Sequence, residues 1–276
     1  MPEASPVKLA QARILVSNDD GIHAPGLKVL ERVARSLSKD VWVIAPEAEQ
    51  SGASHGLTLR RPLPLHKIGP KRFAVGGTPS DCVLMAVKHI MMDRPPDLVL
   101  SGINRGANLG EDVFYSGTIA AAREAALLGL PAIAFSLVRR GDDLFWKTAE
   151  RFAPDIIRKL YANPWPTSVL INVNFPPIPP NEVVGVKVAP QGRRVEHTQV
   201  KIVKDPYGRD VLWVGDFPTD DPKDPKTDLG AIIDKMVSVT PLHCDSTHAA
   251  TLSKINGLFA GLGNGRAKPA RKRAAG

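Results

Sequence analysis

Hydrophobic residues in the first two thirds of the chain follow two alternating patterns. Short apolar runs, typical of strands buried on both faces, occur at residues 14–16, 41–45, 97–101, 132–136 and 169–173. Helical spacing of apolar positions lies between them, at residues 27–37, 79–92, 119–128 and 145–161. This alternation predicts an α/β fold, with a Rossmann-like parallel sheet core covered by helices on both faces.

Other segments depart from this alternation. Residues 57–65 and 73–75 are expected to form a short antiparallel excursion, and Pro154 is expected to break or restart its helix. From residue 182 the pattern predicts an antiparallel β-hairpin extension, with strands at 194–204 and 211–214, and then a C-terminal arm.

These patterns define the expected domain organisation. We expect an N-terminal extension over residues 1–12 and one α/β domain over residues 13–262, in which residues 182–245 form the extension. Residues 263–276 are expected to form a disordered basic tail.

Composition indicates an ordinary globular protein. The 276 residues are 43% hydrophobic and 23% charged. No apolar run reaches the roughly 18 residues of a membrane span, and the first residues lack the apolar core of a signal peptide. We therefore expect a cytoplasmic protein with no membrane partner. Cys82 and Cys244 are expected to be reduced structural thiols.

The positive charge is concentrated at the C-terminus. The formal net charge is +8, and removing the five Lys and Arg residues of residues 266–276 leaves +3 for residues 1–265. A basic tail can bind nucleic acid, but a solvated tail is the more common outcome. Nucleic acid is therefore not the expected partner.

Two adjacent carboxylates follow the first predicted strand, in the segment Ser17-Asn18-Asp19-Asp20-Gly21. Neighbouring anions repel, and a cation relieves that repulsion. The same residues also make a good surface turn. This segment alone leaves a metal site and an acidic turn equally open.

Two more polar loops follow predicted strands. One, at residues 46–56, carries a histidine and two serines, and the other, at residues 101–110, contains Asn104 and Asn108. Loops at the carboxyl ends of parallel strands converge on one edge of the sheet, where ligands bind. Their oxygen donors favour Mg²⁺, Mn²⁺ or Ca²⁺ over zinc. His55 and His23 are each open to a functional or a purely structural role.

The predicted helix after residue 116 opens with Ser116, Gly117 and Thr118. Free N–H groups and hydroxyls at a helix start can bind an anion, although an ordinary serine cap explains the same residues. A phosphate between this helix and a metal would suit phosphoester hydrolysis by water that the metal activates.

Other phosphate and nucleophile chemistries fit the sequence less well. The chain has no Gly-x-Ser-x-Gly elbow, no phosphate-binding Gly-x-x-x-x-Gly-Lys-Ser/Thr loop and no Gly-x-Gly-x-x-Gly after the first strand. The spacing Asp-x-Asp of aspartyl-phosphate enzymes is also missing at Asp19.

Several long motifs occur in one order over roughly residues 13–245, and together they resemble the SurE (stationary-phase survival protein) family. They are ILVSNDDGIHAPG from Ile14, VIAPE from Val43, QSGASH from Gln50, GTPSDC from Gly77, PDLVLSGINRGAN from Pro96, YSGT from Tyr115 and VSVTPL from Val237.

The resemblance implies a metal-dependent phosphatase of nucleoside 5′- and 3′-monophosphates, with possible activity on short polyphosphate. It implies one divalent ion per subunit, Mg²⁺ or Mn²⁺, and a homodimer or homotetramer built partly from residues 182–245. The implied metal ligands are Asp19, Asp20, Ser51 and Asn104, of which Asp19, Asp20 and Asn104 are also the implied catalytic residues. The implied substrate and phosphate contacts are Asn18, Ser54, His55, Asn108, Ser116, Gly117 and Thr118.

The chain departs from the family pattern at two places. Ala120 stands where relatives more often have glycine, which bears on the shape of the phosphate pocket, and Met236 stands where they often have tyrosine, which bears on substrate preference or assembly. A non-catalytic nucleotide or metal sensor on the same scaffold is the alternative to an enzyme.

Overall fold

The computed structural model describes residues 7–141, 143–196, 198–215 and 222–259. The chain divides into two compact units, Met1–Cys244 and Asp245–Gly276. The first unit holds the sheet and its helices. Within the described part of the second unit lies α6 (Ala249–Ile255), whose residues are all exposed.

The first unit is built on a nine-stranded sheet with the order β3-β4-β2-β1-β5-β6-β7-β11-β8. The six strands from β4 to β7 run parallel, while β3 and β11 pair antiparallel with β4 and β7. The strands are β1 (Arg13–Ser17), β2 (Asp40–Pro46), β3 (Leu65–Gly69), β4 (Arg72–Val75), β5 (Leu98–Arg105), β6 (Ala132–Leu137), β7 (Val169–Phe175), β8 (Gly185–Val188) and β11 (Met236–His243). The chain order reverses between β1 and β5, the position where open α/β sheets bind ligands.

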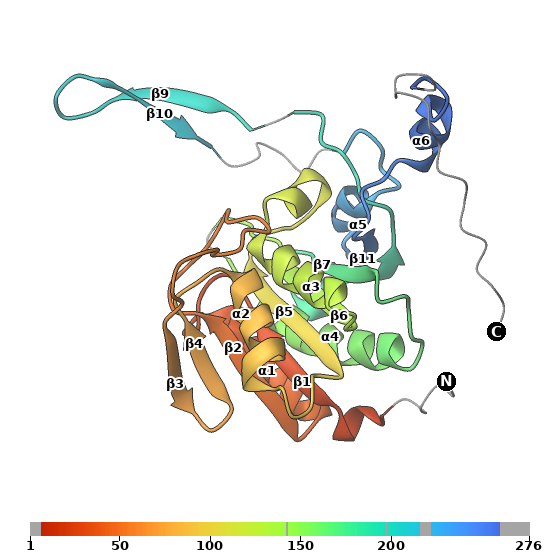
Figure 1. Cartoon of the computed structure of the whole chain (residues 1–276). Coiled ribbons are helices and arrows are strands. Elements are labelled where there is room, and N and C mark those ends of the chain that lie inside the picture. Colours follow the sequence, from red (N-terminus) through yellow and green to blue (C-terminus); the bar gives the residue numbers. More distant parts are fainter. Residues whose placement is uncertain (1–6, 142, 197, 216–221, 260–276) are drawn as a thin grey trace. The chain divides into compact units, whose positions relative to one another are not determined.

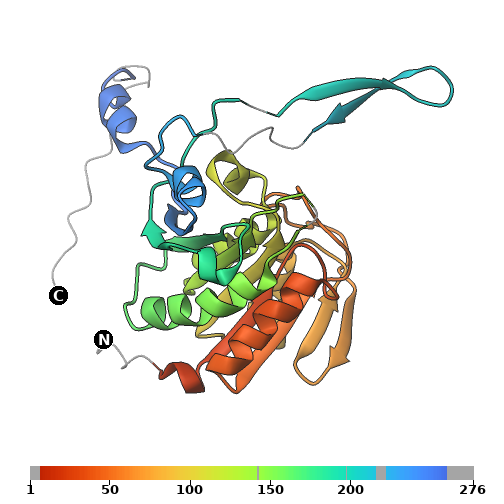
Figure 2. The ribbon, with the colours of Figure 1, turned by 180° about the vertical axis from the view of Figure 1, so that it is seen from behind.

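Helices cover both faces of this sheet, which confirms the predicted fold class (Figures 1 and 2). α1 (Pro25–Leu37) and α4 (Trp146–Tyr161) pack on one face, and α2 (Pro79–Met85) and α3 (Gly117–Leu127) pack on the other. Shorter helical segments are η1 (Leu9–Gln11), η2 (Ala86–Ile90), η3 (Gly110–Phe114), η4 (Pro180–Glu182) and α5 (Asp228–Ile233).

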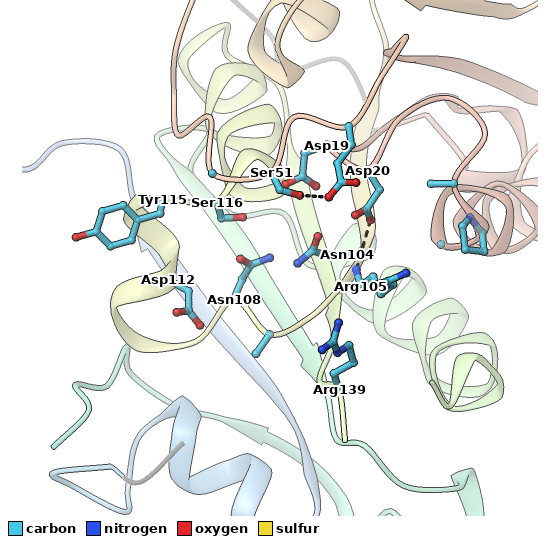
Figure 3. A pocket seen from close by; sticks show the side chains of 16 residues that line it. Asp19, Asp20, Ser51, Asn104, Arg105, Asn108, Asp112, Tyr115, Ser116 and Arg139 are labelled. Carbon is cyan, nitrogen blue, oxygen red and sulfur yellow. Dashed lines mark hydrogen bonds between the residues drawn. The ribbon is translucent and has the colours of Figure 1, made fainter. Parts of the chain in front are cut away.

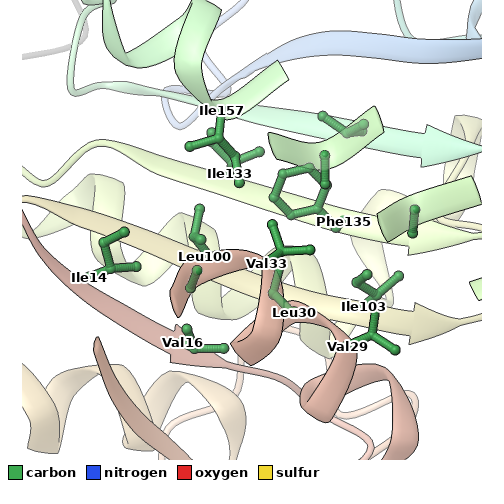
Figure 4. Close-up of a cluster of buried hydrophobic side chains, with 14 of the residues drawn as sticks. Ile14, Val16, Val29, Leu30, Val33, Leu100, Ile103, Ile133, Phe135 and Ile157 are labelled. Carbon is green, nitrogen blue, oxygen red and sulfur yellow. The ribbon is translucent and has the colours of Figure 1, made fainter. Parts of the chain in front are cut away.

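The core explains why the central strands are apolar throughout. Ile14 and Val16 of β1 pack with Leu30 and Val33 of α1, whereas Leu15 points to the opposite face, toward α2 and α3 (Figure 4). A strand that is buried on both faces needs apolar side chains at every position.

Three expected elements differ from the structure. β3 begins at Leu65, and residues 57–64 form no strand, since the prolines at 62 and 64 cannot donate to a ladder. The hairpin strand begins at Val200 rather than at residue 194, because the Arg194 side chain is held by the loop after β5. Pro154 lies inside α4 without ending it, because the buried face of the helix packs against the core.

The predicted hairpin is formed by β9 (Val200–Lys204) and β10 (Asp210–Val214), which pair antiparallel. All ten strand residues are exposed, among them Ile202, Leu212 and Trp213. In the part of the chain that the structure describes, no helix has the length and apolar character needed to span a bilayer.

Candidate functional site

A pocket of about 540 Å³ opens at the carboxyl edge of the parallel strands. It lies over β1, β2, β5 and β6, where the ends of these strands and the start of α3 meet (Figure 3). Its polar lining consists of Asp19, Asp20, Glu49, Ser51, Asn104, Arg105, Asn108, Asp112, Tyr115, Ser116 and Arg139. The convergence expected of the three polar loops is therefore present.

Asp19 is buried beneath this pocket, against the start of α3. Thr118 Oγ1 donates a hydrogen bond to Asp19 Oδ1. Gly117 makes this approach possible, because a Cβ atom at that position would lie 2.7 Å from the Cβ of Asp19. The helix start thus fixes the Asp19 carboxylate, leaving its neighbour Asp20 half-buried at the pocket wall.

The two carboxylates are electrostatically unsatisfied. Burial raises the pKa of Asp19 despite the hydrogen bond from Thr118. Burial first, and the charge of Asp19 second, raise the pKa of Asp20 to about 6, although the Arg105 N–H donates to Asp20 Oδ2 at 3.4 Å. A cation between the two carboxylates would offset both the cost of burial and their mutual repulsion, because it stabilises the charged forms.

Ser51 and Asn104 bring further oxygen atoms to the pocket. Ser51 Oγ donates to Glu49 Oε1 at 2.8 Å, and Asn104 Nδ2 donates to the carbonyl of Gly106 at 3.1 Å. The second bond orients the amide, and its oxygen faces the carboxylates in Figure 3. Both residues therefore present oxygen donors on the side of the pocket where the carboxylates lie.

This donor set fits a hard divalent cation. Two carboxylates, a hydroxyl and an amide oxygen are the ligands of Mg²⁺, Mn²⁺ or Ca²⁺ rather than of zinc. Within the described ranges, no group of three or more His, Cys, Asp and Glu residues is placed to hold a metal. The hydroxyl and the amide are therefore part of the candidate donor set. Next to the pair, the buried Asn18 Oδ1 accepts no hydrogen bond from the described residues.

The opposite side of the pocket suits an anion. Ser116 is the N-cap of α3 and its Oγ accepts a hydrogen bond from Ile119 N at 3.0 Å, so the ordinary cap is present. The start of a helix carries a partial positive charge. Beside it, Asn108 is buried and its Nδ2 donates to Ser136 Oγ at 2.7 Å.

Five of the predicted substrate-contact residues lie outside the pocket lining. Asn18 Nδ2 bonds the Gly21 carbonyl at 3.0 Å, and Thr118 bonds Asp19, with Gly117 packed against the same carboxylate. Ser54 Oγ donates to the Phe114 carbonyl at 2.7 Å, and His55 Nε2 lies 2.9 Å from Glu124 Oε2. In this geometry the five are engaged by other residues of the fold, and their contact with substrate stays a prediction.

Sequence reasoning did not find several residues of the lining. Glu49, Arg105 and Tyr115 belong to segments already singled out, but their side chains carried no signal of their own, and Asp112 lies between two such segments. Arg139 lies just beyond β6. The argument that strand ends share one edge, extended to this strand, would have found it.

The loop after β5 is also held by Arg194 and Asp228, two distant residues that no sequence motif indicated. Arg194 is buried, and its guanidinium donates to the Leu109 carbonyl at 3.0 Å and to Asp112 Oδ2 at 2.8 Å. Asp228 accepts from Gly110 N at 2.9 Å and from Gly192 N at 2.8 Å. The contacts to Asp112 and Gly110 join residues that are 82 and 118 positions apart in the chain.

Together, the fold and the site define an α/β protein with an oxygen-lined cation site and an adjoining anion site at the switch point of its sheet. The family model described as Survival protein SurE matches residues 14–198. The 5′-nucleotidase SurE of Paramagnetospirillum magneticum is 51% identical over 259 residues, which is 94% of this chain and 98% of that protein. The protein of the same name from Parvibaculum lavamentivorans is 51% identical over 263 residues, 93% and 94% of the two chains.

Solved structures agree. The crystal structure of the SurE protein from Aquifex aeolicus matches with a TM-score of 0.79 and 39% identity, covering 89% of this chain and 98% of that one. The chain therefore belongs to the SurE family, as its motifs led us to expect.

Proposed function

We propose that this protein is a divalent-metal-dependent phosphomonoesterase that hydrolyses nucleoside 5′- and 3′-monophosphates to nucleoside and phosphate, with short polyphosphate as a further substrate. The observation that carries the proposal is the pair of carboxylates beside the start of α3, buried Asp19 and half-buried Asp20, which have raised pKa values and no ion-pair partner among the described residues. The proposal draws further support from similar proteins that bear the name 5′-nucleotidase SurE.

Asp19, Asp20, Ser51 and Asn104 are the residues that would hold one divalent ion per subunit, Mg²⁺ or Mn²⁺. Bound there, the ion supplies positive charge that polarises the phosphoryl oxygens and favours ionisation of the attacking water. Thr118 keeps the Asp19 carboxylate oriented by its hydrogen bond.

The remaining pocket residues bind and orient the phosphate. Ser116 and the first N–H groups of α3 face charge that develops on the phosphoryl oxygens, and such fixed donors stabilise a transition state. Asn108 is held rigidly, since its N–H donates to Asn174 Oδ1 at 2.9 Å and its carbonyl accepts from Asn172 Nδ2 at 2.7 Å. A rigid amide at this place can keep one orientation toward the substrate.

Phosphate release from AMP and GMP, with Mn²⁺, with Mg²⁺ and with EDTA, tests the proposal. We expect release that depends on the metal and is lost in an Asp19→Ala control. Tight nucleotide binding without metal-dependent release would contradict it and would favour the non-catalytic sensor, which no present observation supports.

We further propose that the protein assembles as a homodimer or homotetramer through residues 182–245. Supporting this, the hairpin of β9 and β10 exposes Ile202, Leu212 and Trp213, and apolar surfaces of this kind commonly mark protein contacts. Light scattering after gel filtration gives the mass directly. A monomer at micromolar concentration would contradict the proposal.

A further inference from the structure

Two arginines on neighbouring strand ends form part of the pocket lining. Arg105 is the last residue of β5, and it pairs in register with Leu137, the last residue of β6. Gly106 N donates to the Leu137 carbonyl at 3.0 Å, and Arg139 lies two residues further on. The backbone thus brings both arginines to the same part of the pocket (Figure 3).

Neither guanidinium is used by the fold. Among the described residues, the side chains of Arg105 and Arg139 form no ion pair and donate no hydrogen bond, and both are exposed. Arg194 and Arg72 are examples of arginines that the fold does engage, since each donates to a carboxylate and to a backbone carbonyl. The charge of Arg105 acts on Asp20, but the N–H donors of both guanidinium groups remain free to bind an anion from solution.

The position of the pair relative to the cation site limits what that anion can be. In Figure 3 both guanidinium groups lie on the side of Asn104 away from Ser116 and the start of α3. A phosphoryl group held between the carboxylate-bound cation and Ser116 would therefore leave the arginines for a different part of the ligand. Planar guanidinium groups match phosphate oxygens in pairs.

We propose that Arg105 and Arg139 bind a second phosphoryl group, beyond the one that is hydrolysed, and so raise kcat/KM for substrates with two or more phosphates relative to the value that the site would have without the arginines. This inference rests on the proposed phosphomonoesterase function. The second group can belong to a linear phosphate chain or to a nucleoside bisphosphate, and the same chemistry serves both.

The test compares kcat/KM for AMP, inorganic tripolyphosphate and adenosine 3′,5′-bisphosphate with Mn²⁺, in the wild type and in Arg139→Gln. Hydrogen bonds between charged groups correspond to about a tenfold change or more in affinity. For each protein, kcat/KM for tripolyphosphate and for the bisphosphate is divided by kcat/KM for AMP. We expect at least one of these two ratios to be about tenfold lower in Arg139→Gln than in the wild type. The substrate whose ratio falls identifies the source of the second phosphate.

Arg140→Gln is the matched control, because Arg140 is the adjacent exposed arginine and does not line the pocket. Its ratios should equal those of the wild type. An equal loss for all three substrates in Arg139→Gln, no loss for any, or the same loss in Arg140→Gln would overturn the inference.

Failure of the proposed function gives a different result. If the wild type releases no phosphate from any of the three compounds, the hydrolase proposal fails, and calorimetric binding of tripolyphosphate in Mg²⁺ still tests the arginines. A Kd about tenfold weaker in Arg139→Gln supports the second phosphate site, and an unchanged Kd overturns it.

Discussion

The two ends of the parallel sheet treat their carboxylates in opposite ways. At the amino end, Asp40 accepts hydrogen bonds from Arg13 Nε at 2.9 Å, Lys71 Nζ at 2.7 Å and Trp42 Nε1 at 2.9 Å. Burial acts to raise the pKa of Asp40, but these hydrogen bonds outweigh it and lower that pKa to about 2.

At the carboxyl end, Asp19 accepts a hydrogen bond from Thr118 and Asp20 one from the Arg105 N–H, but neither forms an ion pair with a described residue. Both pKa values are raised, that of Asp20 to about 6. Arg105, close by, offers its backbone N–H but no ion pair. At the amino end the charged groups bind one another and stabilise the strands. At the carboxyl end the two carboxylates remain available to bind a ligand. This difference marks a binding site more clearly than the presence of acidic residues does.

The largest effect is expected from Asp19→Asn, which removes one of the two carboxylates at the carboxyl end of the sheet. We expect kcat/KM for AMP to fall at least about 100-fold. Without the Asp19 carboxylate the cation is bound less tightly and less well oriented, and the transition state loses several kcal/mol of stabilisation. Phosphate release at saturating Mn²⁺ measures the loss.

The stability of the same variant is the control. In EDTA, Asp19→Asn should unfold at the same temperature as the wild type or slightly above it, since carboxylate repulsion is relieved. A large drop in melting temperature would instead give Asp19 a structural role and remove it from the argument.

The sequence predicts only one side of this difference between the two ends of the sheet. The carboxyl end was predictable, because the polar motifs of Asp19, Ser51 and Asn104 each follow an apolar run, and parallel strands deliver such loops to one edge. For the same reason the parallel order of the core and the helices on both faces followed from periodicity alone.

What was missed depends on contacts between distant residues. Nothing local in the sequence shows that Arg194 holds the loop at Asp112, or that His55 pairs with Glu124 69 residues away. Element boundaries failed where tertiary packing outweighs local preference, as at Pro154 inside α4. Side-chain orientation, which placed Ser54 and His55 outside the pocket lining, has no pattern in the sequence at all.

Removing the Asp40 carboxylate at the amino end of the sheet should lower stability and leave catalysis intact. Asp40→Asn removes the charge that Arg13 and Lys71 share, and we expect the free energy of unfolding at pH 7 to fall by about 1–3 kcal/mol. Urea denaturation measures it. A lowered carboxyl pKa stabilises the fold above the ordinary pKa of 3.8, so the deficit should shrink as the pH falls from about 4 toward 2.

Asp93→Asn is the control for this end, because Asp93 also bonds Arg13 but is exposed. Its effect should be much smaller. Equal effects of the two variants would show that the partial burial of Asp40 adds nothing. A loss of AMP hydrolysis in folded Asp40→Asn would contradict the separation of the two ends.

A smaller effect sharpens the description of the carboxyl end. Ser51→Ala removes a neutral ligand, so we expect the Mn²⁺ concentration at half-maximal activity to rise about tenfold, within the range for a group that supports a metal site. Ser54→Ala is the matched control in the same loop, since Ser54 Oγ is bonded to the Phe114 carbonyl instead. A metal requirement that changes equally in both variants would assign the effect to the loop and not to Ser51.

The smallest effect tests the charge asymmetry itself, through the pH dependence of the metal-free protein. The pKa of Asp20 is about 6 in the fold and near 3.8 when the chain is unfolded. Between these values the folded protein holds the extra proton, so the free energy of unfolding decreases as the pH rises from about 4 to 6. In Asp20→Asn that decrease is missing, and the variant should gain about 1 kcal/mol on the wild type between pH 4.5 and pH 7 in EDTA, after allowance for solvent screening. Saturating Mn²⁺ should reverse the order at pH 7, because the cation stabilises the wild-type carboxylate pair that it binds. If the difference in the free energy of unfolding between the two proteins is the same at pH 4.5 and at pH 7, Asp20 has an ordinary pKa. Only Asp40 would then have a shifted pKa in this comparison of Asp20 with Asp40.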